Sequence, residues 1–407
     1  MKIGDLGITA AKGFSATGGA VGIKKGGTKD MALIYSSAPC KVAGCFTTNL
    51  VKAAPVLWDR HIVRDVKKGQ AVVINSGIAN ACTGQEGYQD CQDTAKAAAK
   101  VLGIEEDAVL VASTGVIGQR LPIEKLTAGV ELLAPTLSES REAAALAAKA
   151  IMTTDTRPKE VSVTIELGGK EVTLGGMCKG AGMIHPNMGT MLSFIGTDAA
   201  IDQELLQEAL SAVVPDTYNM ISVDGDTSTN DTVVVLANGL AGNPEIKEKN
   251  DDYKAFCEAL YQVNVTLAKK IAGDGEGASR LFEVQVKGAV NDAQARILAK
   301  SVVTSTLTKA AIFGKDANWG RILCALGYSG ASFDPEKVEL WFKSDRGTIK
   351  IAEKGTATNY SEEEATQILG ADEVTAICDV HAGNAEATAW GCDLTYDYVK
   401  INADYRS

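Results

Sequence analysis

The segment KGAGMIHPNMGTML, residues 179–192, contains a threonine hydroxyl that needs a base before it can act as a nucleophile. Its only ionisable side chains are Lys179 and His185. A cut between Gly189 and Thr190 would place a free α-amine, with an ordinary pKa of about 7.7–8.0, beside the Thr190 hydroxyl. Glycine suits such a cut because it has no Cβ to hinder attack on its carbonyl. The segment therefore indicates either a self-activating N-terminal threonine or a glycine turn before a strand.

Three further polar stretches could complete an acyl-transfer site around Thr190. STG at residues 113–115 ends an apolar run, so its backbone N–H groups could face a developing oxyanion. TTDT at 153–156 ends a predicted helix, and DGDTSTND at 224–231 is almost entirely hydroxyl and carboxylate. Taken singly, each stretch is typical of a cap or turn. Taken with Thr190, they indicate a nucleophile, an oxyanion hole and polar groups for substrate recognition.

Two groupings of cysteine and histidine offer weaker alternatives. Cys378, His381 and Cys392 resemble half of a zinc site, but the second ligand pair of a structural site is missing. Cys178 and His185 are seven residues apart across a glycine-rich stretch, and together they could form a thiol nucleophile and its base. We interpret the cysteines as buried strand residues and predict no metal.

Composition excludes several classes of function. The chain has 407 residues, of which 45% are hydrophobic and 22% charged, and its net charge of −11 is scattered. This pattern argues against a nucleic-acid surface and favours small-molecule partners. No signal peptide or membrane-spanning run is apparent, and nine irregularly spaced cysteines indicate a reduced, cytoplasmic compartment. The glycine-rich GDGEGA at 273–278 lacks a P-loop lysine, so no bound nucleotide or other cofactor is predicted.

The order of predicted elements gives an α+β or layered α/β class. Apolar runs bounded by turn residues predict strands, and amphipathic runs with caps predict helices. No Pro-, Ser- or Gly-rich linker separates domains, so they are expected to pack closely. The predicted strands are 70–77, 107–118, a hairpin over 159–176, 190–200, 232–239, 280–288, a hairpin over 337–355 and apolar strands near the end; the predicted helices are 91–103, 122–137, 140–152, 203–214, 253–273, 292–314, 318–327 and 361–370, before a polar tail at 401–407.

KGAGMIHPNMGTML resembles the signature of the ornithine acetyltransferases of arginine biosynthesis, which are glutamate N-acetyltransferases. The resemblance extends over essentially the whole chain. It also rests on GFSATGGAVGIK, FTTNLVKAAPV, NSGIANACTG, STGVIG, SVDGDTSTND, AGDGEGASR, GKDANWGRI and INADYRS, in that order. That family usually has alanine before its nucleophile, where this chain has Gly189. Glycine is smaller and should not block cleavage, although its flexibility could change the rate.

The resemblance implies a precursor that cuts itself before Thr190, giving an α chain of 1–189 and a β chain of 190–407 that assemble as two α and two β chains. It implies sheets sandwiched by helices, a fold similar to that of N-terminal-nucleophile hydrolases. By position, it implies that Thr190 is the nucleophile and that Thr114 with Gly115 forms the oxyanion hole. The implied substrate-binding residues are Thr153, Lys179, Thr190, Glu276, Asn402 and Ser407, with Thr154 and Thr156 competing with Thr153.

The implied reaction moves an acetyl group from N-acetylornithine to glutamate. One amide is broken and a similar one is made, so no nucleotide is needed. Lys179 is a plausible partner for a substrate carboxylate, and Glu276 for the ornithine side-chain ammonium. We expect Asn402 and Ser407 to help close the site against water. Whether acetyl-CoA is a second acetyl donor is left open by the sequence. The alternatives are a self-cleaving amidase or aminopeptidase that uses water, and a non-catalytic amino-acid-binding protein.

Overall fold

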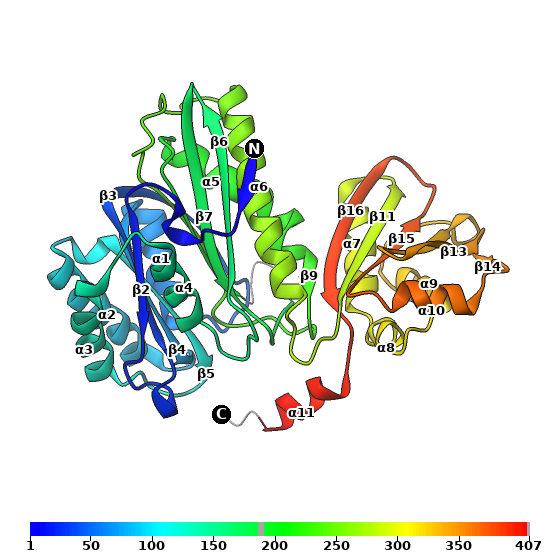
Figure 1. Cartoon of the computed structure of the whole chain (residues 1–407), viewed down its shortest axis with the longest axis horizontal. Coiled ribbons are helices and arrows are strands. Elements are labelled where there is room, and N and C mark those ends of the chain that lie inside the picture. Colours follow the sequence, from blue (N-terminus) through cyan, green and yellow to red (C-terminus); the bar gives the residue numbers. More distant parts are fainter. Residues whose placement is uncertain (186–190, 405–407) are drawn as a thin grey trace.

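A computed structural model of the chain describes residues 1–185 and 191–404, and two mixed β-sheets lie next to each other within these residues (Figure 1). The first sheet has nine strands in the order β1-β6-β7-β8-β10-β3-β4-β5, with β2 paired to β3, and the second has the order β14-β13-β12-β15-β11-β16-β9. The strands are β1 Lys2–Gly4, β2 Phe14–Gly19, β3 Met31–Phe46, β4 Lys68–Ile78, β5 Val109–Val116, β6 Lys159–Leu167, β7 Lys170–Lys179, β8 Leu192–Thr197, β9 Ile221–Ser222, β10 Thr232–Ala237, β11 Leu281–Ala289, β12 Glu339–Ser344, β13 Gly347–Glu353, β14 Thr356–Ala357, β15 Glu373–Asp379 and β16 Ala385–Cys392.

Helices cover both faces of the first sheet and pack on the second (Figure 1). Helices α5 and α6 lie on one face of the first sheet, and α1 to α4 lie on the other or beside it. The α-helices of the described residues are α1 Ala54–His61, α2 Gly84–Leu102, α3 Ile123–Leu133, α4 Arg141–Ala150, α5 Gln203–Val213, α6 Asp251–Ala272, α7 Asp292–Thr304, α8 Thr306–Gly314, α9 Trp319–Gly327, α10 Glu362–Leu369 and α11 Tyr396–Asp404. The prediction of a layered α/β protein is confirmed.

Strand β10 shows why continuous apolar runs form the centre of the first sheet. Val233 and Val235 belong to the core on the α5–α6 side, whereas Val234 and Leu236 belong to the core on the opposite face. Successive side chains of a strand point to opposite faces, so a strand covered on both sides needs apolar residues throughout. β10 runs parallel to β8 and antiparallel to the long strand β3.

The two sheets share one hydrophobic core. A single cluster of buried side chains runs from Val163 of β6 through Val263 of α6 to Val284 of β11. Because this cluster includes residues of both sheets, the two parts pack closely, as expected.

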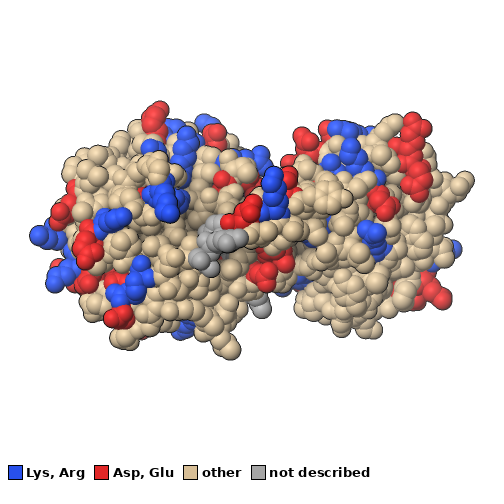
Figure 2. Space-filling view, turned by 90° about the horizontal axis from the view of Figure 1, so that it is seen from below, with Lys and Arg blue, Asp and Glu red and all other residues tan. Residues whose placement is uncertain are grey.

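No helix among the described residues is long and apolar enough to cross a membrane. Charged side chains of both signs are interspersed over the face shown in Figure 2.

Three predicted elements were wrong in detail. The helix predicted over 91–103 is α2, which begins at Gly84. The segment 292–314, predicted as one helix, forms α7 and α8, because the Ser305 side chain accepts a hydrogen bond from the backbone N–H of Thr308 and begins a new helix. Residues 401–404, predicted as polar tail, belong to helix α11. The break predicted at Pro135 is confirmed: α3 ends at Leu133 and a short 3₁₀ turn follows.

The predicted cut between Gly189 and Thr190 falls outside the described residues, but the strands on either side of it are neighbours. β7 and β8 pair antiparallel, with Lys179 opposite Leu192. β8 and β10, which follow residue 190, lie in the middle of the first sheet. The division into 1–189 and 190–407 therefore does not follow the boundary between the two sheets.

Candidate active site

One pocket brings together the predicted site residues that the structure describes. Its lining comes from the end of β5, the segment after α4, the end of β7, the loop before β10, the loop after α6 and helix α11. Gly189, Thr190 and Ser407 lie outside the described residues, although Met191, which follows Thr190, lines the pocket. The lining residues are Ala79, Thr114, Gly115, Ile117, Thr153, Thr154, Lys179, Gly182, Met183, Met191, Leu192, Ser228, Thr229, Asn230, Asp231, Glu276 and Asn402.

Thr114 and Gly115 occupy an irregular end of strand β5. The pairing of β4 with β5 loses its register around Ile78. Gly115 has φ +132°, and a Cβ there would lie 2.2 Å from the carbonyl carbon of Gly77. Only glycine fits so close to the neighbouring strand in this conformation. Thr114 and Gly115 therefore lie where the regular β4–β5 ladder ends, and both line the pocket, where an oxyanion could be bound.

Lys179, the last residue of β7, brings a buried positive charge to the same place. Its Nζ lies 3.5 Å from Thr114 Oγ1, at the limit of a hydrogen bond. Burial lowers the pKa of Lys179, while Asp155 opposes this shift. Among the described residues, Thr114 is the one hydrogen-bond partner of Lys179 Nζ, so the ammonium has donors left for a substrate carboxylate. Charge-assisted hydrogen bonds of this kind gain strength when water is excluded.

A buried ionic network behind the pocket fixes the 153–156 segment. Lys159 Nζ lies 2.6 Å from Asp155 Oδ1 and 2.6 Å from Asp274 Oδ2. Asp155 also accepts hydrogen bonds from the backbone N–H groups of Thr153, at 2.9 Å, and Gly180, at 2.7 Å. Burial alone would raise the pKa of Asp155, but Lys179 and Lys159 outweigh it and hold that pKa well below its usual range.

The same network distinguishes among the three competing threonines. Thr156 donates its backbone N–H to Asp274 at 3.1 Å, and its hydroxyl hydrogen-bonds the same carboxylate. Its side chain is therefore engaged away from the pocket, whereas Thr153 and Thr154 both line it. The choice between Thr153 and Thr154 as a substrate-binding residue stays a prediction.

Glu276 and Asn402 line the same pocket and contact each other. Asn402 Nδ2 donates to Glu276 Oε2 at 2.7 Å, and the Glu276 backbone N–H donates to the Ala181 carbonyl at 2.8 Å. A Cβ on Gly182 would lie 2.4 Å from the Glu276 carboxylate. Glycine at 182 therefore leaves room for the acidic group, and helix α11 is attached to the pocket through Asn402.

The stretch 224–231 supplies two site residues that the sequence did not single out. Asn230 donates from Nδ2 to the Ala79 carbonyl at 2.6 Å and to the Ser113 carbonyl at 2.8 Å, which ties this loop to strands β4 and β5. Asp231 is buried, and no hydrogen-bond partner of its Oδ2 is found within residues 1–185 and 191–404. Burial raises the pKa of Asp231 well above its ordinary value. The dense hydroxyl and carboxylate composition of SVDGDTSTND was the available signal.

The cysteine and histidine groupings lie elsewhere. Cys178 is buried, and its Sγ approaches the Leu267 carbonyl at 3.8 Å. His185 Nδ1 lies 3.1 Å from Ser222 Oγ, and burial lowers the pKa of His185 to about 4. This arrangement gives no thiol–imidazole pair.

Cys378, His381 and Cys392, whose spacing resembles half of a zinc site, differ in their surroundings. Cys378 and Cys392 are buried in strands β15 and β16, as expected for strand residues, whereas His381 is exposed beside Asp379 and Glu339. In the described part of the chain, no group of histidine, cysteine and acidic side chains could hold a metal ion.

Comparison with known proteins identifies the family. A sequence model of the ArgJ family matches residues 15–407. The chain belongs to the ArgJ family. It is 54% identical over 403 residues to the arginine biosynthesis bifunctional protein ArgJ of Symbiobacterium thermophilum, with 98% of each chain covered. It is 53% identical to the protein of the same name from Caldanaerobacter subterraneus, with 100% of each chain covered. The family resemblance read from the motifs is thereby confirmed.

A solved structure also matches this ArgJ-family chain. The crystal structure of arginine biosynthesis bifunctional protein ArgJ from Bacillus halodurans superposes with a TM-score of 0.50 and 51% sequence identity. The match covers 98% of that solved chain but 52% of the present one. The solved chain is thus about half as long as this chain.

Proposed function

We propose that this chain is an arginine-biosynthesis acetyltransferase that moves an acetyl group from N-acetylornithine to glutamate through an acetyl ester on Thr190. The observation that carries the proposal is the single pocket in which Thr114, Gly115, Lys179 and Glu276 meet beside Met191. An oxyanion site, a cation for a carboxylate and an anion for an ammonium are the groups this reaction requires. Family membership and the names of the full-length relatives support the same activity.

Each proposed role follows from the side chain's surroundings. Lys179 binds the α-carboxylate that both amino acids carry, and the Glu276 carboxylate attracts the side-chain ammonium of ornithine. Thr114 and Gly115 bind the oxyanion of the tetrahedral intermediate. Thr153, Asn402 and Ser407 complete substrate binding, and Asn402 is already bonded to Glu276. No metal or cofactor takes part in these steps.

The nucleophile arises by self-cleavage between Gly189 and Thr190. The Thr190 hydroxyl attacks the Gly189 carbonyl, and the Gly189–Thr190 C–N bond breaks to give an ester and the free α-amine of Thr190. Water then hydrolyses the ester, which releases the Gly189 carboxylate and restores the Thr190 hydroxyl. The solved chain of the Bacillus halodurans protein matches about half of the present chain, whereas the related sequences match it over 98–100% of their length. A solved chain of half the length supports an enzyme made of two fragments. The α chain is 1–189, the β chain is 190–407, and two of each form the enzyme.

The same α-amine serves both halves of the transfer. It accepts the Thr190 hydroxyl proton as the oxygen attacks the acetyl carbonyl of N-acetylornithine, and it returns that proton to the departing ornithine amine. Glutamate then attacks the ester through its α-amine, and Thr190 leaves with the proton that the glutamate amine loses. Acetyl is conserved, so no external energy source is needed.

A second activity is glutamate acetylation from acetyl-CoA. The relatives are named bifunctional, which supports two reactions on one nucleophile. The free state of all nine cysteines, each within the described residues, supports a cytoplasmic enzyme.

Labelled acetyl groups test the transfer directly. N-acetylornithine labelled in its acetyl group is incubated with the purified protein, with and without glutamate. We expect labelled N-acetylglutamate and ornithine in equal amounts when glutamate is present, and little free acetate. Equal release of ornithine and acetate in both incubations would identify an amidase that uses water. An intact chain on a denaturing gel with no turnover would identify a non-catalytic binding protein.

A further inference from the structure

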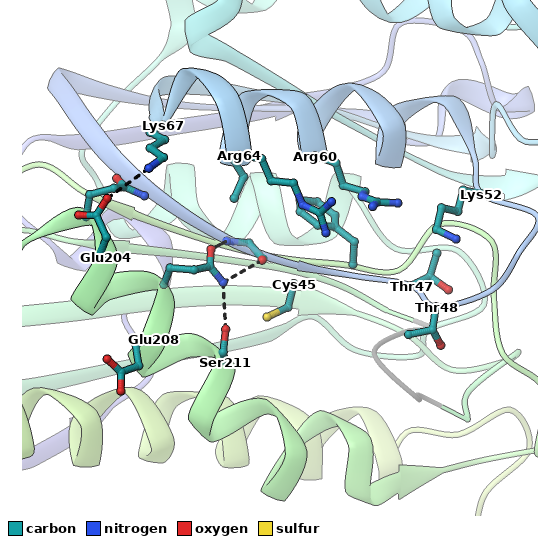
Figure 3. A pocket seen from close by; sticks show the side chains of 15 residues that line it. Cys45, Thr47, Thr48, Lys52, Arg60, Arg64, Lys67, Glu204, Glu208 and Ser211 are labelled. Atoms are coloured by element: carbon teal, nitrogen blue, oxygen red, sulfur yellow. Dashed lines mark hydrogen bonds and ion pairs between the residues drawn. The ribbon is translucent and has the colours of Figure 1, made fainter.

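A groove lined by cationic side chains, shown in Figure 3, contains none of the residues that line the active-site pocket. The C-terminal part of α1 and the π-helical turn Ile62–Val66 form one side, α5 forms the other, and the end of β3 forms the floor. Its volume is about 960 Å³. The four cationic side chains on the α1 side are Lys52, Arg60, Arg64 and Lys67, and the two carboxylates on the α5 side are Glu204 and Glu208.

Both carboxylates of the groove already have lysine partners. Glu204 lies 3.2 Å from Lys67, and Glu208 pairs with Lys249 outside the groove. Asp65, next to Arg64 in sequence, pairs with His61 at 2.8 Å. None of these three acidic groups therefore forms an ion pair with an arginine.

Arg60 and Arg64 are the cations left over. No carboxylate within the described ranges forms an ion pair with either guanidinium, and both side chains extend into the groove in Figure 3. Lys52 lies further along the same side and donates to the Asn49 carbonyl at 2.7 Å. Two unpaired guanidinium groups in a row are suited to phosphate, because each can donate two parallel hydrogen bonds to it.

The groove and the active-site pocket share a wall at Thr47. Thr47 lines the groove, and its backbone N–H donates to the Asp231 carbonyl at 3.0 Å. Its hydroxyl donates to the Ser228 carbonyl at 2.8 Å. Asp231 and Ser228 both line the active-site pocket. Thr47 is only 2% exposed, so it forms part of the partition between the groove and the pocket. A ligand whose charged end lies against Arg60 and Arg64 thus lies next to the wall of the pocket.

We propose that this groove binds the phosphate groups of an acyl-coenzyme A donor while its thioester arm reaches Thr190. The proposal rests on the proposed function, in which Thr190 carries the acetyl group. Coenzyme A bears a diphosphate and a further phosphate at one end and its thiol at the other. It therefore matches a cationic groove adjoining an acyl-transfer site. N-acetylornithine and glutamate carry no phosphate and are accommodated by the pocket alone.

The chemistry differs from the exchange reaction only in the leaving group. The Thr190 oxygen attacks the thioester carbonyl, a C–O bond forms and the C–S bond breaks. The hydroxyl proton, held by the α-amine, passes to the departing sulfur to give the free thiol of coenzyme A. Glutamate then removes the acetyl group as in the exchange.

The test compares donors that differ in their phosphates. Arg60→Ala/Arg64→Ala is assayed for glutamate acetylation with acetyl-CoA and with S-acetylpantetheine, which lacks phosphates, and for exchange with N-acetylornithine. We expect kcat/KM for acetyl-CoA to fall by about tenfold or more, mainly through KM, since losing charge-assisted hydrogen bonds has an effect of this order. Values for S-acetylpantetheine and N-acetylornithine should stay within about twofold of wild type.

Two controls separate this effect from damage to the fold. Arg346→Ala removes an exposed arginine from the second sheet's β12–β13 turn and should leave all three activities unchanged. Arg60→Lys/Arg64→Lys keeps the charge and should recover part of the acetyl-CoA activity. If exchange with N-acetylornithine is absent from wild type, the proposed function fails; if exchange is present, the following outcomes concern the groove alone.

Binding measurements distinguish the source of the phosphate. By calorimetry, CoA should bind wild type and lose affinity in the double alanine variant, and ADP and pyrophosphate should compete with acetyl-CoA but not with N-acetylornithine. An acetyl-CoA reaction insensitive to both arginines would overturn the proposal. So would arginine-dependent binding of ADP or pyrophosphate without any effect on acetyl-CoA turnover, because the groove would then hold a free phosphate ligand. Absence of CoA binding by an exchange-competent wild type would overturn it as well.

Discussion

The variant Gly115→Ala tests why the proposed oxyanion hole needs glycine at this position. Glycine is needed both for the backbone conformation and for the close contact with Gly77. Gly115 has φ +132°, a backbone region that L-residues rarely adopt, at a cost on the order of 1–3 kcal/mol. Its added Cβ would also lie 2.2 Å from the carbonyl carbon of Gly77 and 2.4 Å from its oxygen. Backbone atoms cannot rotate away as a flexible side chain can, so the ends of β4 and β5 must move apart by more than about 1 Å to restore ordinary contact at about 3.5–4.0 Å.

The expected consequence is a loss of catalysis larger than the loss of stability. A displacement of about 1 Å at a catalytic group can cost about 10²-fold in rate. Loss of one oxyanion-hole donor costs about 10²–10³-fold in kcat. Gly115→Ala should therefore lower kcat for the exchange by about 10²–10³, with KM for N-acetylornithine changing little, because an oxyanion exists only along the reaction path.

Gly118→Ala is the matched control in the same loop. Gly118 has φ +82°, so alanine there is also strained, but no atom lies within 4 Å of its added Cβ. Both variants should lose unfolding free energy in urea through backbone strain, and Gly115→Ala should lose more because only its Cβ also clashes with Gly77. Only Gly115→Ala should lose activity strongly. Equal kcat values for the two variants would refute the argument that close contact with Gly77 positions the oxyanion hole.

The remaining predictions concern cleavage, kinetics and the buried ionic network. Thr190→Ala should appear as one chain on a denaturing gel, whereas wild type should give two; a cut variant prepared without added protease would contradict self-cleavage. Initial rates against both substrates should give parallel double-reciprocal lines, and mass spectrometry after N-acetylornithine alone should show the Thr190 fragment heavier by one acetyl group; intersecting lines without that species would indicate direct transfer. Asp155→Asn should lose about 3–5 kcal/mol of unfolding free energy, because buried Lys179 loses its nearby carboxylate and buried Lys159 keeps only Asp274. Because the folded pKa of Asp155 is lowered, its stabilisation in wild type should be present above its ordinary pKa of 3.8 and decline as pH falls below that value, and a flat urea-unfolding profile through this range would argue against it.

The sequence predicts a strand well when the strand is buried on both faces, because its residues are then apolar throughout. The run TVVVLA of β10 has no polar interruption after Thr232, since Val234 packs on one face of the sheet and Val235 on the other. A break such as Ser305 is harder to predict. An amphipathic pattern continues across it, and the new helix is recognisable only from the hydrogen bond between the Ser305 side chain and the Thr308 backbone.

Helix α11 illustrates a different failure of sequence reasoning. It has no buried residue, and Tyr396 and Val399 are 84% and 66% exposed, so no apolar stripe marks it as a helix. Polar contacts fix it instead: Asn402 bonds Glu276, and Thr395 just before the helix donates to the Gly277 carbonyl at 2.6 Å. Such contacts join segments more than 100 residues apart and leave no periodic signal.

The pocket itself could be predicted in part. The end of a strand marked Thr114 and Gly115, and the family motifs marked Lys179 and Glu276, but the choice among the threonines of TTDT depends on Asp274, which is 118 residues from Thr156. The polar stretch 224–231 was recognised as a unit. Which of its side chains face the pocket depends on the turns within it, and these are set by tertiary hydrogen bonds.

The position of the proposed cut has a structural consequence for the two fragments. Residues 1–189 supply Thr114 and Lys179 to the pocket, whereas residues 190–407 supply Asp231 and Glu276. The fragments are also interleaved in one sheet, because β8 and β10 of the second fragment lie between β7 and β3 of the first. Separating them would break two backbone ladders and expose both faces of the buried strand β10, an unfavourable loss of hydrogen bonds and apolar burial. A chain cut at residue 190 should therefore stay one folded unit, with its catalytic groups held in place by the same sheet that formed before cleavage.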